Sequence, residues 1–196
     1  YVAFISTDNE SGGKAIGEYI ASKLEAGTEV AQITLNQARI NGVLRKDGFD
    51  KGIAANNLVD VDFKQMEKVN RSEGETYAQD LITAHPNLGA IFCHSEDPAM
   101  GAASALEAAG RTDVLVAAFD CSPEVVEGIR SGSIAGTSAQ QPVLMGRYAA
   151  QAVVNHLAGK EVEKEITMET MLVTKDNIDD VYDKLVEVAL DDGSAS

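Results

Sequence analysis

Short apolar runs alternate along the chain with longer segments in which apolar residues recur every three or four positions. The clearest example consists of the apolar run Leu88–Cys93, a helical segment opened by Asp97-Pro98, and a second apolar run Val114–Phe119. Two strands joined by a helix must lie parallel, and strands that are apolar on both faces need helices on both sides. The pattern therefore predicts an α/β fold, a doubly wound parallel sheet with helices on both faces.

The same alternation extends over the rest of the chain. Further strands are expected at Val2–Ser6, Val30–Leu35, Val61–Val69, Ile134–Ala139 and Ile166–Val173. The charges within Val61–Val69 indicate a strand at the edge of the sheet.

Helix signals lie between the expected strands. A capping box is expected at Ser72–Glu75, an N-cap at Ser122 followed by Pro123, and a longer helix from Pro142. An amphipathic helix over Asp176–Leu190 and a frayed tail over Asp191–Ser196 are expected to close the chain.

Length and charge narrow the possibilities. A chain of 196 residues suits one substantial core, or one domain with part of another. No apolar run approaches the roughly 18 residues of a membrane-spanning helix, so a soluble chain is expected. With 31 acidic against 16 basic residues the formal charge is −15, which repels phosphate backbones, and nucleic acid is not expected to contact this segment. Tyr1 lies directly in a strand-like run without a signal segment before it, which suggests that an upstream part has been removed.

Polar residues follow the expected strands or begin the helices after them, at the edge where open α/β sheets place their ligands. They are Asp8, Asn9, Arg45, Asn70, His94, Ser95, Asp120 and Gln140. Carboxylates accept hydrogen bonds from adjacent hydroxyls, a guanidinium donates them and an amide does both, so the set suits a polyol. Helix capping is the alternative for each, and it is favoured for Asp8, Asn9 and Ser122. Arg45 has less structural reason to stand at a helix start.

Other chemistry finds less support. Cys93, His94, Asp120 and Cys121 carry metal-ligating atoms, but no pair has a ligand spacing such as Cys-x-x-Cys, and neither a metal nor a cofactor is expected. Free thiols are favoured over a disulfide between the two cysteines, because the sequence cannot supply the Cβ geometry. Ser95 follows His94 directly, so in an extended segment their side chains point to opposite faces, and no enzyme activity is expected.

Six motifs in order along the chain resemble those of one family. They are Ser6–Lys14 (STDNxxGGK), Ala84–Pro86 (AHP), Ile91–Ala102 (IF, then MGA), Phe119–Pro123 (FDxxP), Ala139–Gly146 (AQQPxxMG) and Leu172–Asn177 (LVTKDN). By these motifs the chain resembles the type I periplasmic sugar-binding proteins, and among them the ribose-binding proteins, up to about Asn177.

The resemblance implies a two-lobe protein of which this chain is the carboxyl-terminal portion. Residues 1–140 correspond to the second lobe, residues 141–170 to a helix and strand of a mostly absent first lobe, and residues 171–196 to a return segment with an extra terminal helix. The helix from Pro142 then lacks its usual neighbours. An exposed apolar face is expected there, which predicts repacking, association with another copy, or contact with a partner.

The resemblance also implies roles for individual residues. Arg45, Asp120 and Gln140 match residues that hydrogen-bond sugar hydroxyls. Ser95 stands where the ribose binders have asparagine, and the aromatic residue that the family has near Asn70 is missing. These departures lead us to expect a small sugar or polyol rather than ribose itself.

The expected function is solute binding outside the cytoplasm, in the periplasm, for an ABC importer. Two lobes would close around the ligand, and the membrane permease would recognise the closed form. Two alternatives share the architecture: the effector-binding core of a lactose-repressor-type transcription regulator, and a sugar-sensing ectodomain. A helix-turn-helix upstream would mark the regulator, whereas a secretion signal would mark the transport protein.

Overall fold

The computed structural model describes residues 1–182, and a six-stranded sheet forms its centre. The strand order is β3-β2-β4-β5-β6-β8, and all neighbours are parallel except the antiparallel pair β6 and β8. The strands are β2 (Glu29–Thr34), β3 (Val59–Gln65), β4 (Leu88–Cys93), β5 (Leu115–Phe119), β6 (Gly136–Ala139) and β8 (Met171–Thr174). The predicted parallel sheet is confirmed, and its last strand runs the other way.

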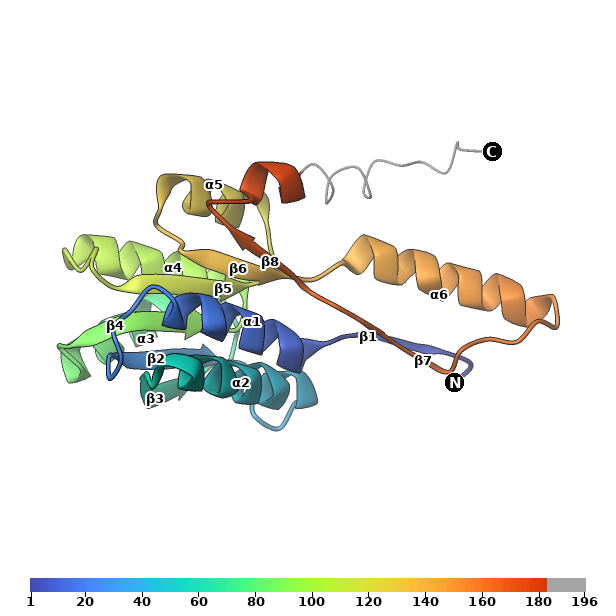
Figure 1. The fold of residues 1–196 in the computed structure, drawn as a ribbon, viewed down its shortest axis with the longest axis horizontal. Coiled ribbons are helices and arrows are strands. Elements are labelled where there is room, and N and C mark those ends of the chain that lie inside the picture. The colour runs from blue at the N-terminus through green and yellow to red at the C-terminus, as the bar shows by residue number, and fades with distance from the viewer. Residues whose placement is uncertain (183–196) are drawn as a thin grey trace.

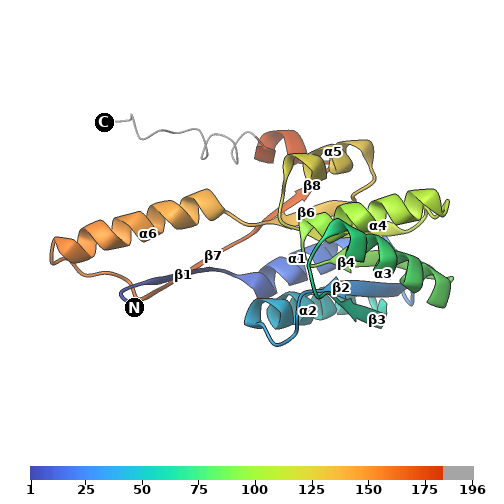
Figure 2. The ribbon, with the colours of Figure 1, turned by 180° about the vertical axis from the view of Figure 1, so that it is seen from behind.

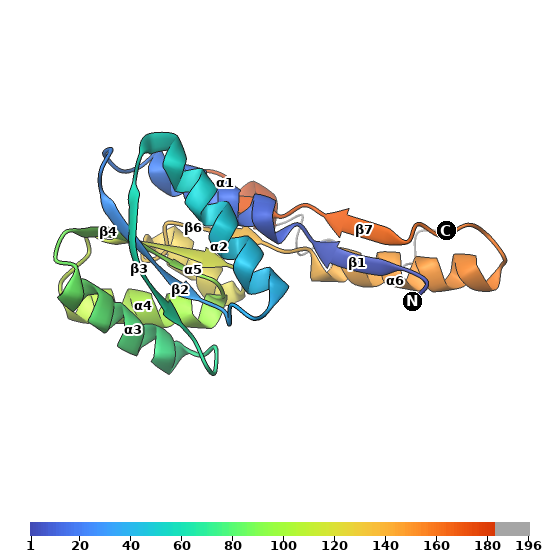
Figure 3. The same ribbon diagram turned by 90° about the horizontal axis from the view of Figure 1, so that it is seen from below.

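Helices cover both faces of this sheet, as Figure 3 shows. The helices of the body are α1 (Asn9–Ala21), α2 (Ile40–Ile53), α3 (Arg71–Ala84), α4 (Glu96–Ala108) and α5 (Pro123–Ser131). One core cluster joins α1 and α2 to the sheet through Ile16, Phe49 and Phe92, and another joins α3, α4 and α5 to the opposite face. Alternate residues of the strands enter the two clusters, which explains why the strands are apolar on both faces.

A smaller unit, which we call the arm, projects from this body (Figures 1 and 2). It contains β1 (Phe4–Thr7), β7 (Glu165–Met168) and α6 (Pro142–Leu157), and β1 and β7 form a parallel pair of their own. The prediction of a single strand over Ile166–Val173 is wrong, because the chain leaves the arm after β7 and joins the central sheet as β8. The first predicted strand, Val2–Ser6, corresponds to β1 and also belongs to the arm.

The chain crosses between arm and body three times, at residues 8, 140–141 and 169–170, and hydrogen bonds link the crossings to one another. Thr7 Oγ1 donates to Gln140 Oε1 (2.6 Å), and the Asp8 amide donates to the Met168 carbonyl (2.8 Å). Ser138 Oγ donates to Thr170 Oγ1 (2.8 Å). All three crossings are therefore tied together side by side.

Local signals place some helix starts correctly and others one or two residues away. Ser122 caps α5 with Pro123 in its first turn, as predicted. The capping residues of α3 are Asn70 and Glu73, two residues before the predicted Ser72 and Glu75. Asn70 Oδ1 accepts from the Glu73 amide, and the Glu73 carboxylate accepts from the amides of residues 67–69. The helix expected to open at Asp97 starts at Glu96.

The predicted edge strand and closing helix are partly confirmed. β3 lies at the sheet edge as expected, but it covers Val59–Gln65 and ends before Val69, which has a left-handed φ of 50°. Residues 178–182 are helical. The remainder of the predicted closing helix and the tail lie outside the described residues.

Glycines allow α1 and α2 to pack backbone to backbone. A Cβ at Gly48 would collide with the carbonyl oxygen of Glu10 in α1, whereas a Cβ at Gly146 in α6 would meet nothing within 4 Å. We expect Gly48→Ala to lower the free energy of unfolding by about 1–3 kcal/mol, because the two helices must separate. Gly146→Ala, the matched control, should raise it by about 0.4–1 kcal/mol. Urea unfolding of both variants measures the difference, and equal stabilities would contradict this packing.

Candidate functional site

The candidate site lies at the carboxyl edge of the sheet, where the strand order reverses. β2 pairs with β3 on one side and with β4 on the other, and such a switch point leaves a crevice outside the strand ends. The loop after β2 leads to Arg45 in α2, β5 ends beside Asp120, and β6 ends beside Gln140. Three separate strand connections thus bring these side chains to one edge.

Arg45 is the buried cation of this edge, with 4% of its surface exposed. Its Nε donates to Asn9 Oδ1 (2.8 Å), its Nη1 donates to the His94 carbonyl (2.6 Å), and its guanidinium lies 3.7 Å from the centre of the Phe119 ring. Burial lowers the pKa of Arg45 to about 10, and Asp120 opposes this shift. Arg45 stays charged at neutral pH, in an orientation set by fixed partners.

Asp120 connects Arg45 to Gln140. Its Oδ2 lies 3.8 Å from Arg45 Nη1, and its Oδ1 accepts a short hydrogen bond from Gln140 Nε2. Gln140 Oε1 in turn accepts from Thr7. Asp120 has a left-handed φ of 76°, a conformation that Asp and Asn tolerate better than most residues, and its side chain is about 29% exposed. A carboxylate, an amide and a guanidinium are therefore presented together, which can recognise neighbouring hydroxyls.

Two predicted residues at the start of α1 have different roles. Asp8 is the N-cap, since its carboxylate accepts from the Ser11 amide, which confirms capping for this residue. Asn9 is not the cap: its Nδ2 donates to the Thr7 carbonyl and its Oδ1 receives Arg45. Asn9 therefore belongs with the Arg45 cluster.

The other three predicted residues are His94, Ser95 and Asn70. His94 is fully buried, so its imidazole lies beneath the edge and only its carbonyl meets Arg45. Ser95 precedes α4 at the N-cap position, is half-buried, and makes no side-chain capping bond. Asn70 uses its side chain to cap α3. The structure thus brings together Arg45, Asp120, Gln140 and Asn9, and it does not place the His94 ring on the surface.

Sequence reasoning missed Glu96, in the first turn of α4. Burial and then the charge of Asp120 raise the pKa of the Glu96 carboxyl, and hydrogen bonds from Ser122 oppose the rise. Its place directly after Ser95 gave a signal for the site, but an acidic residue in a first helical turn is also common for electrostatic reasons. Thr7 was missed as well, because its bond to Gln140 spans 133 positions.

A pH dependence of stability follows from Glu96. Because its pKa is higher in the folded protein than in the unfolded chain, the folded state holds this proton more tightly, and stability falls as the pH rises between the two values. We expect Glu96→Gln to remove this fall: the variant gains stability at neutral pH, with no gain below the unfolded pKa of about 4.3. Urea midpoints measured against pH test this, with Glu107→Gln on the exposed side of α4 as control. A constant difference at every pH would contradict the assignment.

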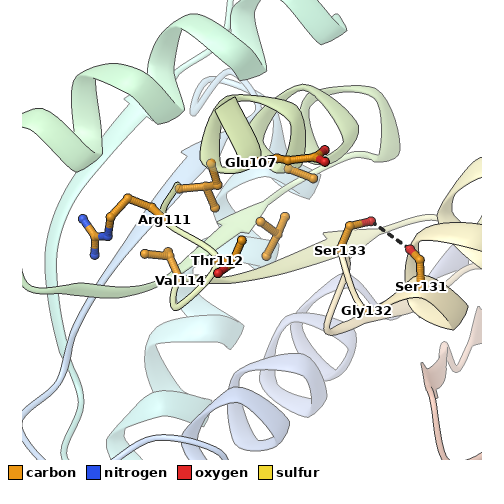
Figure 4. A pocket seen from close by; sticks show the side chains of 10 residues that line it. Glu107, Arg111, Thr112, Val114, Ser131, Gly132 and Ser133 are labelled. Carbon is orange, nitrogen blue, oxygen red and sulfur yellow. Dashed lines mark hydrogen bonds between the residues drawn. The ribbon is translucent and has the colours of Figure 1, made fainter. Parts of the chain in front are cut away.

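A hollow lies at the opposite, amino-terminal edge of the sheet (Figure 4), with a volume of about 480 Å³. Ser131 and Ser133 face each other there (3.3 Å), while the Arg111 side chain points away from them and binds Asp113 and the Leu88 carbonyl. Arg111, Ser131 and Ser133 have hydrogen-bond partners within the chain. The carboxyl edge, where a guanidinium, a carboxylate and an amide converge, is the better candidate site.

Metal binding and cysteine chemistry are the alternatives to hydroxyl recognition. Within residues 1–182, no group of three or more His, Cys, Asp or Glu side chains has an arrangement that fits a metal ion. Cys93 and Cys121 are free thiols. Burial, with the charges of Glu96 and Asp120, raises the pKa of Cys121 to about 11, so this thiol stays protonated at neutral pH. In the same part of the chain, no helix combines the length and apolar character needed to cross a membrane.

Comparison with known proteins gives consistent matches. A family model described as "periplasmic binding protein domain" matches residues 1–161. The chain is 33% identical over 174 residues to the ribose import binding protein of Salmonella typhimurium (strain LT2), which covers 89% of this chain and 58% of the relative. It is 32% identical to the ribose import binding protein of Bacillus subtilis (strain 168), covering 87% and 55%, and 30% identical to the D-allose-binding periplasmic protein of Escherichia coli (strain K12), covering 87% and 56%.

Solved structures agree on the fold. An ABC transporter periplasmic solute-binding protein from Actinobacillus succinogenes with bound D-allose superposes with a TM-score of 0.86 at 23% identity, over 91% of this chain and 63% of that one. A solute-binding protein from Bacillus halodurans with bound myo-inositol gives 0.85 at 24% identity, over 93% and 64%. The chain spans a little over half the length of the curated relatives it matches.

Proposed function

The chain belongs to the periplasmic binding protein family, and we propose that it is the larger part of an extracytoplasmic solute-binding protein that captures a small sugar or polyol for an ABC importer. The observation that carries this proposal is the convergence of Arg45, Asp120 and Gln140 on one edge of the sheet. Matching relatives are named for ribose and D-allose. They are binding proteins rather than enzymes, which agrees with a role without catalysis.

The chemistry of the edge supports a ligand with adjacent hydroxyl groups. Asp120 accepts hydrogen bonds, Arg45 donates them, and Gln140 does both, so a ring with neighbouring hydroxyls finds partners of each kind. Ser95 offers one more hydroxyl beside them. The hydrogen bond that now links Gln140 to Asp120 is available for exchange with ligand hydroxyls.

Capture would involve a second lobe. In this proposal the body, residues 8–140 with the return segment from 171, is one lobe, and the arm is a piece of the other. The ligand bridges the two lobes and stabilises the closed form, since it contacts both only when they meet. A membrane permease then recognises the closed protein in the periplasm or its equivalent outside the cytoplasm.

The matched relatives favour importer proteins over the lactose-repressor-type alternative. The test is calorimetric titration of the complete protein with pentoses, hexoses and polyols, among them D-ribose, D-allose and myo-inositol. We expect one or a few to bind with a one-to-one stoichiometry. Absence of binding across the panel would contradict the proposal.

Self-association of the present 196-residue chain is a further part of the proposal. Val153, Val154 and Leu157 on α6 are 58–80% exposed, an apolar face of the kind that lobes usually cover. We expect this chain to dimerise through α6, and Val154→Lys to weaken the dimer by about 1.5–3 kcal/mol or more, since each copy loses one buried side chain. Sedimentation equilibrium measures it. Val59→Lys, on the exposed face of β3, is the matched control and should leave the mass unchanged. A monomeric parent chain would contradict this expectation.

A further inference from the structure

A second polar network lies between the sheet and α2, beneath the residues proposed to bind ligand. Its centre is Gln32 in β2, which is completely buried. Gln32 Nε2 donates to Asp50 Oδ1 in α2 (2.7 Å) and to Asp60 Oδ2 in β3 (2.9 Å), and its Oε1 lies 3.1 Å from His94 Nε2. A buried amide with three such contacts is satisfied on both its donor and its acceptor side.

The proton positions of this network follow from its chemistry. The Leu35 amide can only donate, so His94 Nδ1, 3.4 Å away, must accept. Nε2 therefore carries the imidazole proton and donates to Gln32 Oε1. Burial, followed by the nearby charges of Arg45 and Lys46, lowers the pKa of His94 well below its ordinary value, which keeps the ring neutral and preserves this direction.

The network reaches α2 at the turn that carries Arg45. Lys46, the next residue, binds Asp50 (2.7 Å) and Asp60 (3.3 Å), the two carboxylates that also hold Gln32. Hydrogen bonds through Gln32 therefore link α2 to β2 and β3. The same amide also holds the ring of His94, whose carbonyl accepts from Arg45.

Gln32 thus holds both partners of the Arg45–His94 hydrogen bond. It binds α2, which carries Arg45, through Asp50, and it binds His94 through the imidazole. The backbone register of β2 with β4 ends at Ile33 and Cys93, and the His94 amide still donates to the Ile33 carbonyl (2.9 Å). The His94 imidazole extends the link one step further, to the Leu35 amide. We infer that Gln32 and His94 are positioning residues that hold the Arg45 guanidinium in the orientation used for ligand. Only the contact between Arg45 and a ligand rests on the proposed function; the positioning of Arg45 does not.

The test separates positioning from general stability. His94→Leu has a similar size but removes both ring hydrogen bonds, whereas His94→Gln offers an oxygen to the Leu35 amide and an NH₂ to Gln32. Ile91→Val in β4 is the control, because its side chain packs in the core cluster on the opposite face of the sheet. In the ligand-free complete protein, ¹⁵N NMR follows the exchange with water of the Arg45 guanidinium protons, on Nη1, which donates to the His94 carbonyl, and on Nε, which donates to Asn9.

We expect His94→Leu to speed this exchange by about tenfold or more, and His94→Gln and Ile91→Val to stay within about twofold of the parent. A folded His94→Leu variant with unchanged exchange overturns the inference, as does an Ile91→Val variant that behaves like His94→Leu. Should His94→Leu fail to fold, Gln32→Met removes the same bond from the β2 side and is judged by the same outcomes.

Sugar titrations of the same variants then connect the network to binding. His94→Leu is expected to lose about tenfold or more in affinity for any panel sugar that the parent binds, with His94→Gln restoring it. Unchanged affinity in His94→Leu overturns the role in binding. If the parent binds no sugar, the proposed function fails, and the exchange measurement alone still decides whether Gln32 and His94 position Arg45.

Discussion

Replacement of Arg45 by alanine is expected to weaken sugar binding by the complete protein by about 2–5 kcal/mol, which is roughly 30-fold to several thousand-fold in affinity. Arg45 is almost fully buried, is oriented by Asn9 and the His94 carbonyl, and lies on the Phe119 ring. Its removal takes away a charged donor and leaves the Asp120 carboxylate beside the ligand without its counter-charge. Calorimetric titration with the sugar that binds the parent measures the loss.

Two further variants test whether the loss comes from the side chain of Arg45 itself. Arg45→Lys keeps the charge but not the planar fork, so it should recover only part of the affinity. Arg130→Ala removes the same charge from α5, where Arg130 pairs with exposed Glu127 and Asp179 away from the candidate site, and it should bind sugar normally. If Arg45→Ala binds sugar within twofold of the parent, a difference of about 0.4 kcal/mol, then Arg45 does not contribute to the binding site.

Asp120→Asn is expected to have the second largest effect, a loss of about 2–3 kcal/mol in sugar binding. Asn tolerates the left-handed conformation of residue 120 and keeps the shape of the side chain, so the change isolates the charge. The carboxylate that accepts from ligand hydroxyls is lost, and Arg45 keeps its charge in a buried position without its acidic neighbour. Titration of the variant with the parent's ligand gives the measurement.

The backbone contribution is separated by Asp120→Ala. Alanine at a φ of 76° is strained, so this variant should lose stability in urea as well as affinity, whereas Asp120→Asn should lose mainly affinity. Asp97→Asn, on the exposed side of α4, is the charge control and should bind normally. Equal binding by the Asp120→Asn variant and the parent would show that the carboxylate does not contact the ligand.

Much of the fold could be predicted because its signals are local. Buried strands such as Leu88–Cys93 read as apolar runs, and Ser122 with Pro123 marks a helix start whatever packs around it. The division of Ile166–Val173 into two strands could not be predicted in this way. An apolar run shows that residues are extended, but the change from one sheet to another at residues 169–170 depends on distant partners in β1 and β6.

The site shows the same limit. Residue type and position near strand ends placed Arg45, Asp120 and Gln140 among eight candidates at one edge, and the family resemblance singled out these three. Position could not show that the His94 ring is buried, with Gln32 of β2 as its partner, rather than exposed at the edge. Nor could it show that Asn9 binds Arg45 while Asp8 caps the helix, since adjacent residues of a helix start point in different directions.

The bonded crossings between arm and body have a mechanical consequence. Three short chain segments tied side by side resist torsion about their own direction, yet they can flex together about a line that runs across all three. Gln140 lies in one of these crossings and also beside Asp120. A ligand that replaces the Gln140–Asp120 hydrogen bond would therefore act at the pivot itself, where a small displacement turns the far end of the arm through the largest arc.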